Sequence, residues 1–163
     1  MAFNGKSETV YLTRERLVEM EQELHSLKTE GRRTVAQKIA EARGHGDLSE
    51  NAEYEAAKEE QQHLEMKIMK LEQTLSRAKI IDARDLPRDN RIYILSRVEV
   101  KDLGSGVHCE YLLVSPEEAS FEQNKISVTS PIGKALLGKV QGDKVDIRVP
   151  AGLLHYEILK VSR

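Results

Sequence analysis

Residues 44–54 read GHGDLSENAEY, and they separate two long segments whose apolar residues repeat with helical periodicity. Gly44 and Gly46 favour the end of one helix and a turn of the chain. The acids that follow favour the start of a second helix, because a helix N-terminus carries partial positive charge. The stretch therefore predicts the turn of a helical hairpin with acidic side chains at its end.

Both flanking segments carry a stripe of apolar or small side chains at coiled-coil spacing. Across 13–43 the stripe is Leu17, Met20, Leu24, Leu27, Gly31, Val35, Ile39 and Ala42. Across 49–79 it is Tyr54, Ala57, Gln61, Leu64, Ile68, Leu71, Leu75 and Ala78. After Leu27 the steps lengthen to four residues, a stutter that predicts local unwinding of the supercoil. Neither stripe is wide enough for an isolated helix, so the pattern predicts an antiparallel pair with arms of about 45 Å.

The second half of the chain has a different period. Residues 83–91 have the composition of a linker, and strands are expected at 91–95, 96–103, 108–115, 125–130, 144–150 and 154–161. The segment SPIGKALLG predicts a short helix that Pro131 opens and Gly138 closes. We therefore expect an α+β protein, with a coiled-coil hairpin in residues 1–82 and a twisted antiparallel sheet with one helix in residues 83–163.

Composition excludes several classes of function. The chain of 163 residues has a net charge of −2, so no overall basic character points to nucleic acid. Cys109 is the only cysteine, which excludes an internal disulfide and multi-cysteine zinc sites, and its strand context predicts a buried, inert thiol. No signal peptide or membrane-length apolar run is present, which predicts a soluble intracellular protein. The second half shows no catalytic motif around its histidines.

The turn itself has two interpretations. Asp47 and Glu50 have the spacing of a capping box for the second helix. A capping box does not use the side-chain oxygens of Ser49 and Asn51. These oxygens could bind a cation, because hard cations such as Mg²⁺ prefer oxygen ligands. Two acids alone would hold Mg²⁺ weakly, so the turn is predicted to contribute to a metal site that another molecule completes. His45 with two acids is a weak pattern for zinc.

Several stretches resemble the Gre family, the transcript-cleavage factors of bacterial RNA polymerase. They are ARGHGDLSENAEYEAAKEEQ (42–61), KIIDARDLP (79–87), FEQNKISVTSPIGKALLGK (121–139) and GDKVDIRVPAG (142–152). The acidic and small residues after the turn are more similar to the GreA branch than to the more basic GreB branch.

The resemblance implies a coiled-coil hairpin followed by an FKBP-like domain. It implies that the domain docks at the rim of the polymerase secondary channel and that the hairpin enters the channel. Asp47 and Glu50 would then help to hold a catalytic Mg²⁺ of the polymerase, near the 3′ end of backtracked RNA. Ser49 and Tyr54 are candidate helpers. No nuclease activity or cofactor of its own is implied, and a cytoplasmic monomer is expected.

The resemblance also points to candidate contact residues. Thr129, Ser130 and Pro131 would dock on the polymerase, although Thr129 departs from the Asn or Asp that is frequent there. Along the first helix, basic side chains are candidates for contacting RNA phosphates, with pairing to neighbouring glutamates as the alternative. They are Arg32, Arg33, Lys38 and Arg43. Three other functions remain open at this point: a Gre-like inhibitor of polymerase, an FKBP-like binding or chaperone module, and a plain coiled-coil scaffold.

Overall fold

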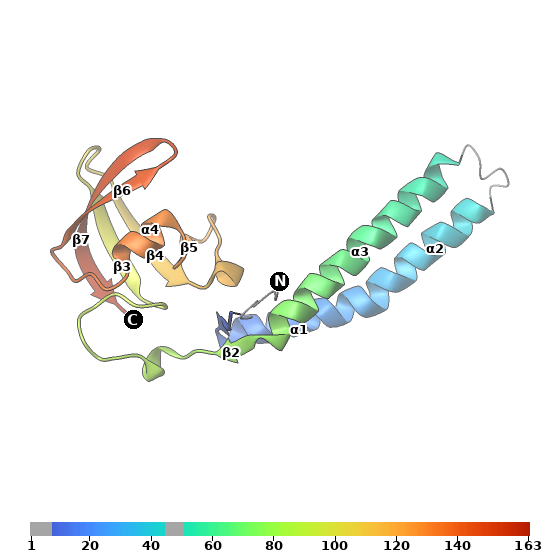
Figure 1. The fold of residues 1–163 in the computed structure, drawn as a ribbon, viewed down its shortest axis with the longest axis horizontal. Coiled ribbons are helices and arrows are strands. Elements are labelled where there is room, and N and C mark those ends of the chain that lie inside the picture. The colour runs from blue at the N-terminus through green and yellow to red at the C-terminus, as the bar shows by residue number, and fades with distance from the viewer. Residues whose placement is uncertain (1–7, 45–50) are drawn as a thin grey trace, which may run out of the picture. The chain divides into compact units, whose positions relative to one another are not determined.

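The computed structural model describes residues 8–44 and 51–163, and the chain divides into two compact units. One unit contains the helical residues up to Lys79. The other contains Ile80–Arg163 together with Tyr11–Arg14. Figure 1 shows the helices of the first unit and the sheet of the second.

The first unit is a hairpin of two long helical arms (Figure 1). The first arm consists of α1 (Arg14–Ser26), a π-helical segment η1 (Leu27–Gly31) and α2 (Arg32–Arg43), which follow one another without a break. The second arm is α3 (Ala52–Ser76). Short strands β1 (Val10–Leu12) and β2 (Ala78–Ile80) pair with each other near the ends of the arms.

The predicted stripes form the seam of this hairpin. Every position of both stripes is buried or half-buried, whereas most of the residues between them are exposed. Met20 and Val35 on the first arm and Ile68 on the second are at most 4% exposed. Close to the turn the seam is made by the small residues Ala42 and Ala57. The coiled-coil periodicity therefore predicted the packing face of each arm correctly.

The stutter coincides with the π-helical segment. In a regular α-helix, residues four apart are separated by slightly more than one full turn. Successive steps of four at Leu27, Gly31 and Val35 would therefore rotate these residues away from the seam. A π-helical turn contains more residues and rotates less per residue, which keeps these positions facing α3. Gly31 lies against Leu64, and a Cβ atom there would lie 3.1 Å from a Leu64 methyl carbon. The widened turn thus brings the backbone of the first arm close to the second.

Two expected boundaries of the second helix are wrong. The helix begins at Ala52 rather than near residue 49, and it ends at Ser76 rather than at Lys79. Residues 78–80 leave the helix because they pair with β1. Ala78 is half-buried although it lies in β2 rather than in the helix.

The second unit is built on a five-stranded sheet with the order β5-β4-β3-β7-β6. The strands are β3 (Arg97–Asp102), β4 (His108–Val114), β5 (Lys125–Ser127), β6 (Lys144–Val149) and β7 (Gly152–Ser162). Short 3-10 turns η2 (Ala83–Asp85) and η3 (Pro116–Glu118) precede β3 and β5, and the helix α4 (Pro131–Leu136) follows β5. The α+β class is as predicted.

Two details of the predicted sheet are wrong. The sheet is mixed rather than antiparallel, because the edge strand β5 runs parallel to β4. Residues 91–95 do not form a strand: Ile92 is fully buried in the core, and Leu95 has a positive φ of 68° in a turn. Burial rather than strand pairing explains the apolar character of that segment.

Alternating residues of the strands build the core of this unit. Val98 and Val100 of β3 and Ile158 of β7 are fully buried, together with Leu113 at the end of β4. Leu136 of α4 completes the cluster. The helix thus packs on the apolar face of the sheet and fixes the loop that enters it.

Candidate functional site

The acidic turn lies largely outside the described residues. This applies to Asp47, Ser49 and Glu50, and also to His45, so their predicted roles in metal binding and RNA cleavage remain predictions. The structure describes the residues on either side of the turn: the last turn of α2, up to Gly44, and the first turn of α3, from Asn51 onward.

Asn51 joins the two helices at this end of the hairpin. Its side-chain oxygen accepts a hydrogen bond from the Tyr54 amide at 3.0 Å, and its side-chain nitrogen donates to the Ala42 carbonyl at 2.6 Å. The first bond caps α3, and the second satisfies a carbonyl in the last turn of α2. Asn51 is therefore the N-cap residue, and the prediction that Asp47 caps the helix is wrong. The preference of asparagine for N-caps was a signal in the sequence that could have identified it.

Tyr54 and Arg43, predicted for different roles, lie together. The Arg43 guanidinium carbon is 5.8 Å from the centre of the Tyr54 ring, and the ring is half-buried. This distance is that of a cation–π contact, worth about 0.5–1 kcal/mol at an exposed site. Together with Asn51, the pair ties the end of α2 to the start of α3.

The other basic candidates are engaged with glutamates. Arg32 makes two hydrogen bonds to Glu65 on the opposite arm, at 2.9 and 3.0 Å. These bonds lower the pKa of the Glu65 carboxyl and raise that of the Arg32 guanidinium. Lys38 pairs across the seam at 2.7 Å with Glu60.

Arg33 instead pairs with Glu30 on its own arm, at 2.6 Å. For Arg32, Arg33 and Lys38 the geometry is that of the alternative interpretation, pairing with glutamates. An RNA phosphate would have to compete with a carboxylate at each of these positions.

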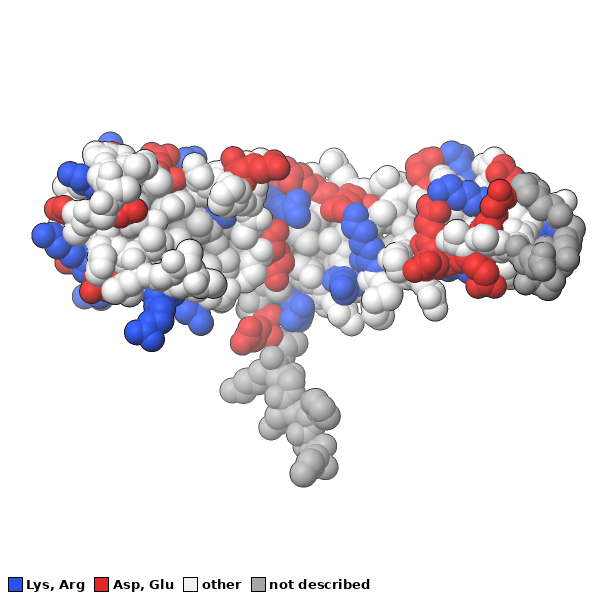
Figure 2. Space-filling view, turned by 90° about the horizontal axis from the view of Figure 1, so that it is seen from above, with Lys and Arg blue, Asp and Glu red and all other residues white. Residues whose placement is uncertain are grey.

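Acidic and basic side chains alternate along the hairpin surface, as Figure 2 shows for one face. Two further ion pairs cross between the arms, Lys28 with Glu72 and Lys67 with Glu23. Opposite charges on facing helices favour one register of the pair over others. The charges of the hairpin thus favour one alignment of its arms.

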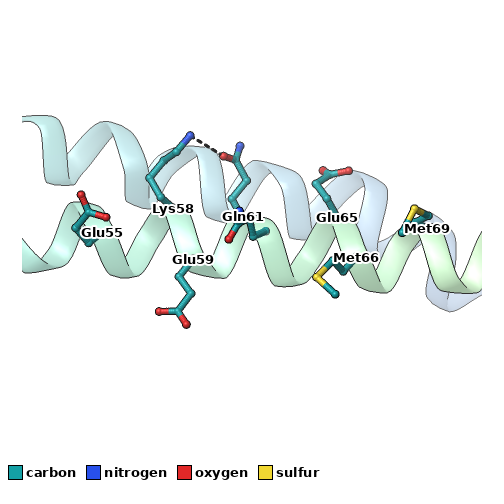
Figure 3. A pocket seen from close by; sticks show the side chains of 8 residues that line it. Glu55, Lys58, Glu59, Gln61, Glu65, Met66 and Met69 are labelled. Carbon is teal, nitrogen blue, oxygen red and sulfur yellow. Dashed lines mark hydrogen bonds between the residues drawn. The ribbon is translucent and has the colours of Figure 1, made fainter.

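The outer face of α3 carries a hollow, shown in Figure 3. All the residues that line it belong to this one helix, among them Met66, Met69 and Glu59. Lys58 donates a hydrogen bond to Gln61 at its border. A hollow formed by a single helix lacks the convergent walls of a ligand pocket.

The predicted docking residues lie in a loop before α4 that is held by side-chain hydrogen bonds. The Ser130 hydroxyl donates to the Ser127 carbonyl at 2.6 Å and accepts from the Gly133 amide at 3.0 Å, which caps α4. The hydroxyls of Thr129 and Ser127 are 2.7 Å apart. Pro131 occupies the first helical turn and is exposed. The loop thus presents Thr129 and Pro131 outward on a fixed backbone.

No catalytic or metal-binding cluster appears in the part of the chain that the structure describes. No three His, Cys, Asp or Glu side chains there are grouped to hold a metal ion. His155 and His108 are exposed and lie beside Asp146 and Glu99. Cys109 is only partly buried against the core, rather than buried as predicted. Among the described helices, none is long and apolar enough to span a membrane.

Fold and site thus define a two-unit protein in which a helical hairpin bears an acidic turn and a sheet unit bears an exposed proline loop. Two family models match the chain: "Transcription elongation factor, N-terminal" over residues 10–80, and "Transcription elongation factor, GreA/GreB, C-term" over residues 87–163. The chain belongs to the GreA/GreB family of transcription elongation factors, on the GreA side.

Curated relatives agree along nearly the whole chain. The transcription elongation factor GreA of Prosthecochloris aestuarii is 54% identical over 157 residues, which cover 95% of this chain and 98% of that protein. GreA of Chlorobaculum parvum is 53% identical, with the same shares covered.

Solved structures of similar proteins include GreA factor homolog 1 (Gfh1) of Thermus thermophilus. It is 31% identical, with a TM-score of 0.43 over 96% of this chain and 100% of that one. A GreA/GreB factor from Nitrosomonas europaea is 22% identical, with a TM-score of 0.42 over 96% of this chain and 100% of that one.

Proposed function

We propose that this protein binds bacterial RNA polymerase and stimulates the polymerase to cleave backtracked RNA, which returns arrested complexes to elongation. The observation that carries the proposal is the motif GDLSEN (46–51) at the end of a long, slender hairpin, in a chain of the GreA/GreB family. In this account the hairpin enters the secondary channel, and the sheet unit docks at the channel rim.

Length and slenderness support this role for the hairpin. The first arm is helical from Arg14 to Arg43, which corresponds to about 45 Å at 1.5 Å per residue. Near its end the seam narrows to Ala42 and Ala57. An arm of this length, with small residues near its end, suits a narrow channel that leads to a buried active site.

The acids would act by completing a metal site of the polymerase. Cleavage of a phosphodiester by two metal ions needs one ion to activate water and another to stabilise the leaving oxygen. Asp47 and Glu50 would help to hold the second Mg²⁺ in the active site of the polymerase, with Ser49 and Tyr54 nearby at the RNA 3′ end. Two carboxylates hold Mg²⁺ weakly alone, so the isolated protein is a stimulator rather than a nuclease.

The remaining roles follow from the same account. The loop Thr129–Pro131 docks on the polymerase, and the sheet unit has an FKBP-like fold. Arg43, the last residue of α2 and thus next to the acidic turn, is the best placed of the basic candidates to meet RNA. The protein would act as a cytoplasmic monomer.

Purified protein added to backtracked elongation complexes with Mg²⁺ tests the proposal. We expect release of short RNA fragments from the 3′ end, and none when polymerase is omitted. Slower elongation without RNA release would instead assign the chain to Gre-like inhibitors, and prolyl isomerisation well above background would point to a chaperone module.

A further inference from the structure

One aromatic side chain of the sheet unit is almost completely exposed. Phe121 is 98% exposed, whereas the other exposed large apolar side chains of the described residues are 42–56% exposed. The other described aromatic residue in this group is Tyr11, at 46%. The others therefore keep about half of their surface covered, whereas Phe121 keeps almost none of its surface covered.

The turn that carries Phe121 is rigidly attached to the sheet. Ser120 and Lys125 exchange two backbone hydrogen bonds of 2.9 Å, and the Asn124 amide donates to the Phe121 carbonyl at 3.2 Å. Asn124 adopts a positive φ of 52°, which asparagine tolerates better than most residues. Its carbonyl accepts from the Leu112 amide of β4 at 3.0 Å. Phe121 is therefore displayed on a fixed backbone.

Such a display is typical of a binding anchor. Aromatic side chains are frequent among the residues that dominate interface energies. An anchor whose backbone is already ordered loses little further entropy when it binds. An exposed Phe that packs on nothing in its own unit stabilises no fold, so its apolar surface is available to a partner.

The position of Phe121 connects it with the docking loop. The turn 120–124 enters the edge strand β5, and the loop Thr129–Pro131 leaves it (Figure 1). β5 has three residues and spans about 10 Å. One partner surface of ordinary size, about 800 Å² on each side, covers both ends of such a strand.

The border of this turn is acidic. Residues 116–124 contain Glu117, Glu118 and Glu122 and no basic residue. Glu118 accepts hydrogen bonds from Thr13, while Glu122 is exposed beside Phe121. A complementary partner surface would offer an apolar pocket with basic residues at its rim.

From these observations we infer that Phe121 is an apolar anchor of the polymerase-docking surface, which extends from the turn 120–124 along β5 to Pro131. This inference rests on the proposed function, because it takes RNA polymerase as the partner. The anchor inserts into an apolar pocket with a basic rim on the polymerase, and the docking loop contacts the adjoining surface.

Binding of fluorescently labelled protein to purified core RNA polymerase tests the inference. We expect Phe121→Ala to weaken binding at least tenfold and Phe121→Leu, which keeps an apolar side chain, to restore most of the affinity. Leu153→Ala is the matched control, since Leu153 is a 53% exposed apolar residue near the start of β7 in the same unit, and it should bind like the parent. Because Phe121 packs on nothing, the circular dichroism and melting of Phe121→Ala should equal those of the parent.

The outcomes separate the inference from the proposed function. Phe121→Ala should need a higher protein concentration than the parent for half-maximal RNA release, by the same factor by which its affinity for polymerase falls. Equal affinity of Phe121→Ala and parent would overturn the inference while leaving the proposed function intact. The inference would also be overturned if the parent were dimeric by light scattering and Phe121→Ala were monomeric. In that case Phe121 would bind a second copy of this chain rather than polymerase. Failure of the parent to bind polymerase would contradict the proposed function itself.

Discussion

Asn51 shows how one side chain can organise the end of the hairpin. Its amide has both a donor and an acceptor, and each is used, one on α2 and one on α3. Serine or aspartate would cap α3 equally well but would offer no amide donor to the Ala42 carbonyl. The geometry thus explains why an asparagine, rather than another capping residue, suits this position.

Substitutions of Asn51 should separate its two bonds. Asn51→Ala loses both, and we expect it to lower the free energy of unfolding by about 1–2 kcal/mol. Asn51→Asp keeps the acceptor for the Tyr54 amide and should lose less. Hydrogen exchange at the Tyr54 amide should accelerate in Asn51→Ala only. Equal exchange in Asn51→Ala and parent would show that the cap does not form in solution.

Asp82 provides a prediction on pH. Hydrogen bonds from the Arg84 side chain and backbone lower its pKa from 3.8 to about 2. Because the folded-state pKa is depressed, the stabilisation is complete above about pH 4 and is lost as the pH falls towards 2. Arg84→Ala should raise the pKa of Asp82 measured by NMR titration, whereas Arg88→Ala should leave it unchanged. An unaltered pKa in Arg84→Ala would show that the side-chain bonds are absent in solution.

At the scale of elements, the hairpin depends on a narrow seam. Ile68 is 2% exposed at its centre, while Met66 and Met69 on the outer face of the same helix are 51% exposed (Figure 3). Ile68 and Met66 differ in burial although their side chains are similar in size. They therefore make a matched pair for testing the seam.

Ile68→Ala should therefore destabilise the hairpin by about 2–4 kcal/mol, because it removes buried methyl groups and leaves a cavity. Met66→Ala should change stability by no more than about 0.5 kcal/mol. Urea denaturation followed by helical circular dichroism measures both. Similar losses for the two variants would mean that the seam does not face the way the structure places it.

The elements also show what the sequence alone could predict. Helical periodicity identified both packing faces, because each arm buries one continuous stripe. The parallel pairing of β5 with β4 was missed, since strand direction depends on a partner that local pattern does not reveal. Residues 91–95 were predicted as a strand because they are largely apolar. Their apolar residue Ile92 is instead buried in the core without belonging to a strand. Of the site, the spacing of Asp47 and Glu50 suggested Asp47 as the cap, and the geometry decided for Asn51, which is also a residue type that favours N-caps.

At the scale of the whole molecule, the two units have separable tasks in our account. The hairpin delivers two acids, and the sheet unit supplies the surface that binds polymerase. Variants of the acidic turn should consequently lose stimulation while retaining affinity for polymerase.

RNA release from backtracked elongation complexes tests the central claim most directly. With Mg²⁺ and saturating protein, Asp47→Ala and Glu50→Ala should each abolish the release of short 3′ fragments and still compete with the parent for polymerase. Glu55→Ala, which removes an exposed carboxylate from the first turn of α3, should release RNA at the parental rate. If Asp47→Ala released RNA as fast as the parent, the delivery of acids by the hairpin would be contradicted.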